Sequence, residues 1–152
     1  MNERTKIADK PPYNKPLPTP SAMARPFWDA LRNGELRLQH CPACGHFNHP
    51  PRLLCSKCHN RDLKWDKVEP SGTVYSYTIV HRPPFPVFKE DVPYAVGLVD
   101  IDGTDVRMLG SLLAPLDAIS VGMRVKVIFD DVTDDFTLFR FQSMDATAGA
   151  QS

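Results

Sequence analysis

Four cysteines in two C-x2-C pairs are the residues of this sequence best suited to chemistry. The pairs are Cys41/Cys44 and Cys55/Cys58, and ten residues separate them. Two residues between cysteines let both sulfurs of a pair point at one ion, and Gly45 supplies the backbone angle that such a turn often needs. Four thiolates complete a tetrahedral shell and leave no open position for water. The spacing therefore predicts one structural zinc ion per chain.

Iron is the alternative to zinc, because four thiolates in a tetrahedron also suit iron. An iron site would make the chain a rubredoxin-like electron carrier, a class of protein that does not need the long β-rich segment after residue 68. Four histidines close to the cysteines are possible substitute ligands. Since four cysteines already complete the shell, we expect these histidines to be surface residues. They are His40, His46, His49 and His59.

Catalytic motifs are absent from the sequence, which has no G-x-S-x-G, P-loop, G-x-G-x-x-G or H-E-x-x-H. Metal ligation would occupy every cysteine, so no thiol remains as a nucleophile. His81 is the one histidine away from the cysteines, and beside Arg82 we interpret it as a polar strand end rather than a general base. We expect the isolated chain to catalyse nothing.

A short helix and a strand must deliver the chain to the first cysteine pair. Residues 22–34 predict the helix, with Pro26 in its first turn, where the missing N–H is no loss. Phe27, Trp28 and Leu31 share one face, and Gly34 provides the left-handed residue that ends the helix. Residues 35–40 begin with alternating polar and apolar side chains and predict a strand.

The cysteine segment is too small to have a hydrophobic core of its own. Neighbouring apolar side chains must therefore pack around it, together with the helix at residues 27–31. The candidates for this packing are Leu53, Leu54, Leu63 and Trp65.

The second half of the sequence has an all-β pattern. Five short segments are rich in β-branched and aromatic residues, and turn residues separate them. They are residues 73–80, 94–101, 106–113, 124–130 and 136–141. A single helical turn within residues 115–122 fits the connection between the third and fourth. Five strands in about 70 residues predict a small closed barrel, with the OB-fold as first choice.

The predicted fold is mainly β, with an N-terminal helix and a rubredoxin-like zinc ribbon followed by a five-stranded OB-fold barrel. We expect a flexible proline-rich arm at residues 1–21, the helix and ribbon at 22–67, the barrel at 68–142 and a disordered tail at 143–152. The arm contains many prolines and little apolar periodicity. It is either plainly disordered or becomes ordered against a partner subunit.

Composition and charge exclude some classes of protein. Lysine plus arginine equals aspartate plus glutamate, at 18 each, and no apolar run is long enough to span a membrane. The N-terminal residues lack the apolar segment of a secretory signal, so we expect a cytoplasmic protein. Zinc ribbons and OB-folds both bind nucleic acid, which is the alternative function. Against it, residues 68–142 hold six basic and eleven acidic residues, whereas a nucleic-acid groove needs a basic track.

Several segments of the sequence match one combined pattern: residues 27–36, the two cysteine pairs, Pro50-Pro51-Arg52, residues 72–78 and Pro93-Tyr94. Together they resemble one known family, the zinc-ribbon and OB-fold proteins called "domain of unknown function 35". The resemblance covers about residues 24–142. One departure is Ser56, where many relatives have proline, and this should change the stiffness of the turn but not ligation.

The resemblance implies a function that the spacing of residues does not. Members of this family are usually small companion subunits of thiolase-like enzymes in acyl-CoA chemistry, and some are fused to a hydratase domain. The partner carries the catalytic groups and acts by thiolysis, acyl transfer or retro-aldol cleavage. The resemblance therefore implies a noncatalytic accessory subunit that stabilises its partner and helps to bind a coenzyme A thioester. Since thiolase-like enzymes are usually dimers, we expect two copies of each subunit.

Two groups of residues are candidates for these contacts. Basic side chains of the first half suit the phosphates of coenzyme A. The apolar loop at residues 83–88 suits a partner surface, or else it folds over the open end of the barrel. The coenzyme A candidates are Arg37, Arg52, Lys57 and Arg61, and the partner candidates are Phe85, Val87 and Phe88.

Overall fold

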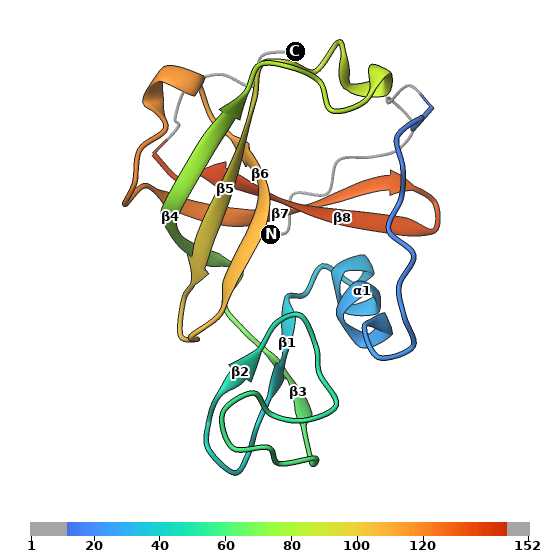
Figure 1. Cartoon of the computed structure of the whole chain (residues 1–152), viewed down its shortest axis with the longest axis vertical. Coiled ribbons are helices and arrows are strands. Elements are labelled where there is room, and N and C mark those ends of the chain that lie inside the picture. Colours follow the sequence, from blue (N-terminus) through green and yellow to red (C-terminus); the bar gives the residue numbers. More distant parts are fainter. Residues whose placement is uncertain (1–11, 146–152) are drawn as a thin grey trace.

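One helix, a small three-stranded sheet and a five-stranded barrel follow one another along the chain (Figure 1). The structure, a computed structural model, describes residues 12–145. Two single 3-10 turns, η2 (Pro86–Phe88) and η3 (Leu116–Ala118), lie in the connections of the barrel. The regular elements are α1 (Arg25–Arg32), β1 (Arg37–His40), β2 (Phe47–Asn48), β3 (Lys64–Lys67), β4 (Ser71–Val80), β5 (Tyr94–Ile101), β6 (Arg107–Leu113), β7 (Arg124–Thr133) and β8 (Phe136–Ser143).

The five barrel strands lie within a few residues of their predicted positions. Their order around the barrel is β4-β5-β6-β8-β7, and the parallel pairing of β6 with β8 closes it. This is the arrangement of an OB-fold, so the predicted fold is confirmed. Strand β5 shows why the prediction worked: buried and half-buried side chains alternate along its whole length. That period of two is the pattern of a strand with one face in a core. The expected helical turn is η3.

The three-stranded sheet is the ribbon. Strand β1 lies at its centre and pairs antiparallel with β2 on one side and β3 on the other. The predicted strand at residues 35–40 is confirmed in β1, but β2 and β3 were not predicted. Strand β2 has only two residues, and β3 has one aromatic residue among charged ones. Neither carries a periodic apolar signal, so their pairing with β1 determines their conformation.

Helix α1 is shorter than the predicted residues 22–34. It starts at Arg25, because Ser21 closes a preceding turn by accepting the N–H of Ala24 at its carbonyl (3.0 Å) and at its hydroxyl (3.2 Å). Pro26 lies in the first turn, as predicted. Gly34 follows the helix with a φ of 71°, the left-handed conformation expected of a terminator.

Ribbon, helix and barrel share one hydrophobic core. The buried cluster includes Phe27 of the helix, Leu36 and Leu38 of the ribbon, and Phe141 of the barrel. Phe27 contacts both sides, with its ring centroid 5.1 Å from that of His49 and 5.9 Å from that of Phe139. Figure 1 shows α1 beside the ribbon and beneath β8. The helix therefore joins the ribbon to the barrel.

The described part of the predicted N-terminal arm, residues 12–21, has no helix or strand but contacts the barrel. The Lys15 amine lies 2.5 Å from the Asp91 carboxylate and 5.7 Å from the centre of the Phe88 ring. The rest of the predicted arm, residues 1–11, and most of the predicted tail, residues 146–152, lie outside the described residues. Within residues 12–145, no helix has the length and apolar character needed to cross a membrane.

Candidate metal centre

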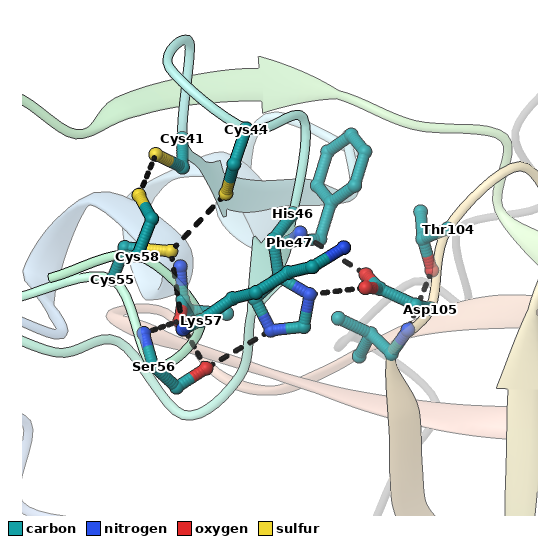
Figure 2. A network of polar contacts seen from close by, with 12 residues as sticks. Cys41, Cys44, His46, Phe47, Cys55, Ser56, Lys57, Cys58, Thr104 and Asp105 are labelled. Carbon is teal, nitrogen blue, oxygen red and sulfur yellow. Dashed lines mark hydrogen bonds and ion pairs between the residues drawn. The ribbon is translucent and has the colours of Figure 1, made fainter. Parts of the chain in front are cut away.

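The four cysteine sulfurs converge on one point, although the residues come from two separate turns (Figure 2). All four Sγ atoms lie within 4.8 Å of one another. Two of these separations are 3.5 Å between Cys41 and Cys58 and 3.6 Å between Cys44 and Cys55. These separations are far longer than a disulfide bond, and all four residues are free cysteines. The structure thus brings together the four residues that the spacing singled out.

The two turns have the same backbone construction. In each, the residue after the second cysteine donates its N–H to the carbonyl of the first, over 2.8 Å from Gly45 and 3.0 Å from His59. Both residues need a left-handed backbone, with φ of 76° at Gly45 and 63° at His59. The role of Gly45 is confirmed. The equivalent role of His59 was missed, because histidine tolerates this conformation but does not announce it.

The thiols affect one another's ionisation. Burial raises the pKa of Cys55, but the N–H groups of Cys58 and Lys57 outweigh it and lower the pKa to about 6. For Cys44, the N–H of His46 lowers the pKa, yet burial and the neighbouring sulfurs together raise it to about 12. Sulfurs this close cannot all ionise without a cation between them, because their charges repel.

A tetrahedral zinc ion fits this donor set. With Zn–S bonds of about 2.3 Å, the edges of a ZnS4 tetrahedron are roughly 3.8 Å long. The observed separations of 3.5 and 3.6 Å are close to that length. Cys41, Cys44, Cys55 and Cys58 would hold the ion, which would link the two turns as a structural cross-link. Such a shell holds a metal that stabilises the fold and does not bind substrate.

A polar network fixes the first turn to the barrel (Figure 2). Asp105, which lies between β5 and β6, accepts hydrogen bonds from the His46 ring at Nδ1 and from the Phe47 N–H, the latter over 3.0 Å. The other ring nitrogen of His46 lies 2.9 Å from Ser56 Oγ. Ser56 donates its hydroxyl to Asn48 Oδ1 over 2.9 Å. The network thus runs from Asp105 through His46 to Ser56. Because Ser56 also bonds to Asn48, it joins the second turn to β2.

A buried amide fixes the loop between the turns. The Gln39 side chain is 6% exposed, donates to the Arg52 carbonyl and accepts the Arg52 N–H, each over 2.9 Å. This pair of bonds imitates strand pairing and satisfies both halves of a buried amide. It holds the backbone at Arg52 against β1.

The expected packing around the ribbon is wrong for two of its leucines. Leu53 is 78% exposed and Leu54 is 37% exposed, because the loop held by Gln39 directs both away from the core. Trp65 does pack against the core from β3, and Leu63 is half-buried. The fully buried leucines of the ribbon are instead Leu36 and Leu38. They belong to residues 35–40, for which the sequence predicted a strand but no role in this packing.

The expectation for the four histidines is correct only for His59, which is exposed. His40 is half-buried, with Nδ1 2.8 Å from a carboxylate oxygen of Asp66. His49 packs against Phe27, and burial lowers its pKa. Among the described residues, the group with metal-ligating geometry contains only the four cysteines.

The coenzyme A candidates lie around the ribbon in different settings. Arg37 is on β1, where its guanidinium lies 2.8 Å from the Glu35 carboxylate. Arg52, Lys57 and Arg61 are exposed on the loops at the cysteine turns. Arg52 also lines a hollow of about 480 Å³ that the loop forms with the second turn.

The three partner candidates divide between surface and barrel. Phe85 is 62% exposed, whereas Val87 and Phe88 in η2 are half-buried. The Phe88 ring lies 6.5 Å from that of Tyr94. Val87 and Phe88 thus pack against the barrel in part, and the exposed Phe85 stays a predicted partner contact. Phe88 and Lys15 also line a groove of about 610 Å³ beside β5, β6 and β8, which the sequence did not indicate.

A four-cysteine ribbon joined by one helix to an OB-fold barrel defines a class of two-part zinc-ribbon proteins. Two family models match in that order: the rubredoxin-like zinc ribbon domain of ChsH2 at residues 28–64 and its C-terminal OB-fold domain at residues 65–130. A chain of the solved "Ltp2-ChsH2(DUF35) aldolase" is 30% identical with a TM-score of 0.74, and the match covers 84% of this chain and 98% of that one. The chain belongs to this ChsH2/DUF35 family.

Three further relatives match part of this chain, and two of them are much longer than it. A "probable enoyl-CoA hydratase alpha subunit" from Thermomonospora curvata is 40% identical over 74% of this chain and 35% of the relative. The "3-oxo-4,17-pregnadiene-20-carboxyl-CoA hydratase alpha subunit" of Mycobacterium tuberculosis is 32% identical over 76% of this chain and 39% of the relative. This chain thus spans little more than a third of both. A "DUF35 domain-containing scaffold protein" from Methanocaldococcus jannaschii is 29% identical over 62% of this chain and 67% of the relative.

Proposed function

We propose that this chain is a noncatalytic, zinc-binding accessory subunit of a thiolase-like acyl-CoA enzyme complex. It stabilises its partner and helps to bind the coenzyme A thioester. The observation that carries the proposal is the match to 98% of a chain of the Ltp2-ChsH2(DUF35) aldolase, with ribbon and barrel in the same order. Similarity over a whole chain supports a shared role better than similarity of fold alone.

The names of the other relatives support two parts of the proposal. Both hydratase alpha subunits are named for CoA thioesters, which supports acyl-CoA as the substrate class. The scaffold proteins of two archaea are named for assembly rather than for a reaction, which supports an accessory role. This chain spans little more than a third of the hydratase subunits, so their activity need not be shared.

The residues of the chain support a structural role for the metal. The four sulfurs are spaced for a tetrahedral shell, and such a shell has no open position for substrate. Zinc in it would hold the two turns together and, through Asp105, would keep the ribbon against the barrel. The catalytic groups of the complex would then belong to the partner.

Contacts to the partner and to coenzyme A follow from exposure and charge. Phe85 is the large apolar side chain of its loop that is free to enter a partner's pocket. Arg52, Lys57 and Arg61 offer cations to the phosphates of coenzyme A around the ribbon, and Arg37 could exchange Glu35 for a phosphate. A two-fold symmetric thiolase-like dimer would bind two copies of this chain.

Co-purification tests the proposal. The chain would be expressed with a thiolase-like subunit from the same genome, and the complex weighed by light scattering during gel filtration. We expect a complex with two copies of each subunit, turnover of a CoA thioester by the complex, and none by this chain alone. Turnover by this chain alone, or no complex at low salt, would contradict the proposal.

A further inference from the structure

Strand β4 has an open edge over its second half. On one side it pairs with β5 from Gly72 to Val80. On the other side it pairs with β7 only from Ser71 to Thr73. The last bonds on that side join Val74 to the loop before β7: its N–H donates to the Met123 carbonyl over 2.9 Å, and its carbonyl accepts the Gly122 N–H over 2.8 Å. In Figure 1, β4 continues past β7 toward the top of the barrel.

Beyond Val74, no strand in residues 12–145 pairs with this edge. The side chains there are accessible, since all four residues from Tyr75 to Thr78 are exposed. Tyr75 is 51% exposed and Tyr77 is 38% exposed. Val121, next to the residue that makes the last bond, is 67% exposed. An open edge of hydrogen-bonding groups is thus bordered by apolar and aromatic side chains.

The sequence of this edge lacks the residues that normally protect one. Residues 74–80 read VYSYTIV, with no charge and no proline, and six of the seven are β-branched or aromatic, the residue types that favour strands. Proteins usually guard open edges with lysine, other charges or proline, because an unguarded edge pairs with other chains. In the ribbon, the edge strand β3 carries Lys64, Asp66 and Lys67, and the other edge strand, β2, has only two residues. The edge of β4 beyond Val74 has neither such charges nor so short a length.

We propose that the open edge of β4 binds an extended segment of the thiolase-like partner, which adds a strand to the barrel alongside residues 75–80. This inference rests on the proposed function for the identity of the partner. Backbone hydrogen bonds supply the affinity in such pairing, and alternate side chains supply the specificity. The segment must be partly apolar to match Tyr77 and Val121, because the Arg107 guanidinium already lies over the Tyr75 ring, 3.4 Å from its centre.

A second copy of this chain is the other possible occupant, and two observations disfavour it. The barrel segment, residues 68–142, has eleven acidic and six basic residues, so two barrels joined edge to edge would repel each other. Six paired residues also extend only about 20 Å. The area buried along so short a strand is below the roughly 1,200 Å² of a stable interface. The occupant must therefore touch the chain elsewhere too. A larger partner that also contacts Phe85 meets this requirement.

Hydrogen exchange of backbone amides tests the pairing directly. The full chain would be compared alone and in its purified complex with the thiolase-like subunit, with coverage of residues 75–80 and of β6. We expect the amides of residues 75–80 that point away from β5 to exchange at least tenfold more slowly in the complex. A complex that forms without this protection would overturn the inference and leave the proposed function standing. Failure of the wild-type chain to form the complex would overturn both.

Paired variants separate the edge from the neighbouring face of the sheet. Ser76→Lys with Thr78→Lys places two guarding charges on the exposed edge strand, and Leu109→Lys is the matched control on β6, where Leu109 is 62% exposed. We expect the edge variant to bind the partner at least tenfold more weakly, with the control within about twofold of wild type. Equal loss in both would mean that the sheet face, not its edge, makes the contact. A dimer of the free chain that the edge variant dissociates would assign the edge to a second copy instead.

Discussion

His46 of the ribbon donates a hydrogen bond from Nδ1 to the carboxylate of Asp105, which lies between two strands of the barrel, 59 residues further along the chain. The same carboxylate accepts the N–H of Phe47 over 3.0 Å. The backbone and one side chain of the first cysteine turn are thus both held by a single residue of the barrel. The orientation of the ribbon relative to the barrel depends on this contact as well as on the shared core.

Asp105→Ala should therefore lower the free energy of unfolding by about 1 kcal/mol, since it removes a charged acceptor from two donors at a partly exposed site. Urea unfolding followed by tryptophan fluorescence measures this. Asp117→Ala is the control, because Asp117 is exposed on η3, away from the ribbon. Equal stability of the two variants would show that the contact does not hold the ribbon in solution.

Metal content is the second prediction. Elemental analysis of protein purified without added metal should find about one zinc per chain. Cys44→Ser breaks the shell and should lower both the zinc content and the melting temperature sharply, since structural zinc sites in small modules bind with about 10–16 kcal/mol. Ser56→Ala, beside a ligand but without a thiol, should retain the ion. Stoichiometric iron and a red colour would instead identify a rubredoxin-like centre.

Acid sensitivity is the third prediction. Hydrogen bonds from Arg124 and Ser71 lower the pKa of Asp102 from 3.8 to about 2. A carboxyl with a lowered pKa in the folded state contributes stability above its unfolded pKa and loses it as the pH falls toward the folded value. Asp102 is 33% exposed, so solvent screening reduces the contribution to about 1 kcal/mol.

Asp102→Asn should accordingly be less stable than wild type near neutral pH, and the difference should shrink as the pH falls from about 4 to about 2. Urea midpoints of both proteins across this range measure the difference. Asp117→Asn, at an exposed carboxyl on η3, is the control variant. A difference that stays constant down to about pH 2 would rule out ionisation of Asp102 as its cause.

The loop at residues 83–88 gives a fourth prediction, in which its two phenylalanines behave differently. Phe85→Ser should weaken binding of the thiolase-like subunit by about 2 kcal/mol without a change in melting temperature, because Phe85 is 62% exposed in the free chain. Phe88→Ser should lower the melting temperature, because Phe88 packs against Tyr94 and Lys15. Calorimetric titration and thermal unfolding separate the two effects. If Phe85→Ser binds as wild type does, this loop lies outside the interface.

Local signals made most of the fold predictable. The barrel strands have a period of two, and the cysteine pairs have a spacing that only a few structures use. Gly45 was identified because glycine marks left-handed positions, whereas His59 occupies the matching position without such a mark. Leu53 and Leu54 misled the prediction, because hydrophobicity alone does not show which way a loop faces.

Long-range contacts could not be predicted from one sequence. The network from Asp105 through His46 to Ser56 joins a barrel turn to both cysteine turns, and none of these residues differs in type from an ordinary surface residue. Gln39 likewise looks like a solvent-exposed strand residue, yet it is buried and holds the backbone of Arg52. The edge of β4 is open because β7 pairs with it only at residues 71–73. The predicted strands do not specify which residues pair.

The position of Phe27 means that ribbon and barrel cannot be encoded as two separate proteins without exposing apolar surface. Its ring lies against His49 on one side and Phe139 on the other, so a break between ribbon and barrel would leave an aromatic surface exposed on each piece. A barrel made without the helix would tend to aggregate. A ribbon made without the barrel would expose the apolar side chains that the barrel buries. Recombination can therefore attach this unit to other enzymes, but only as an indivisible block that carries its ion-binding turns with it.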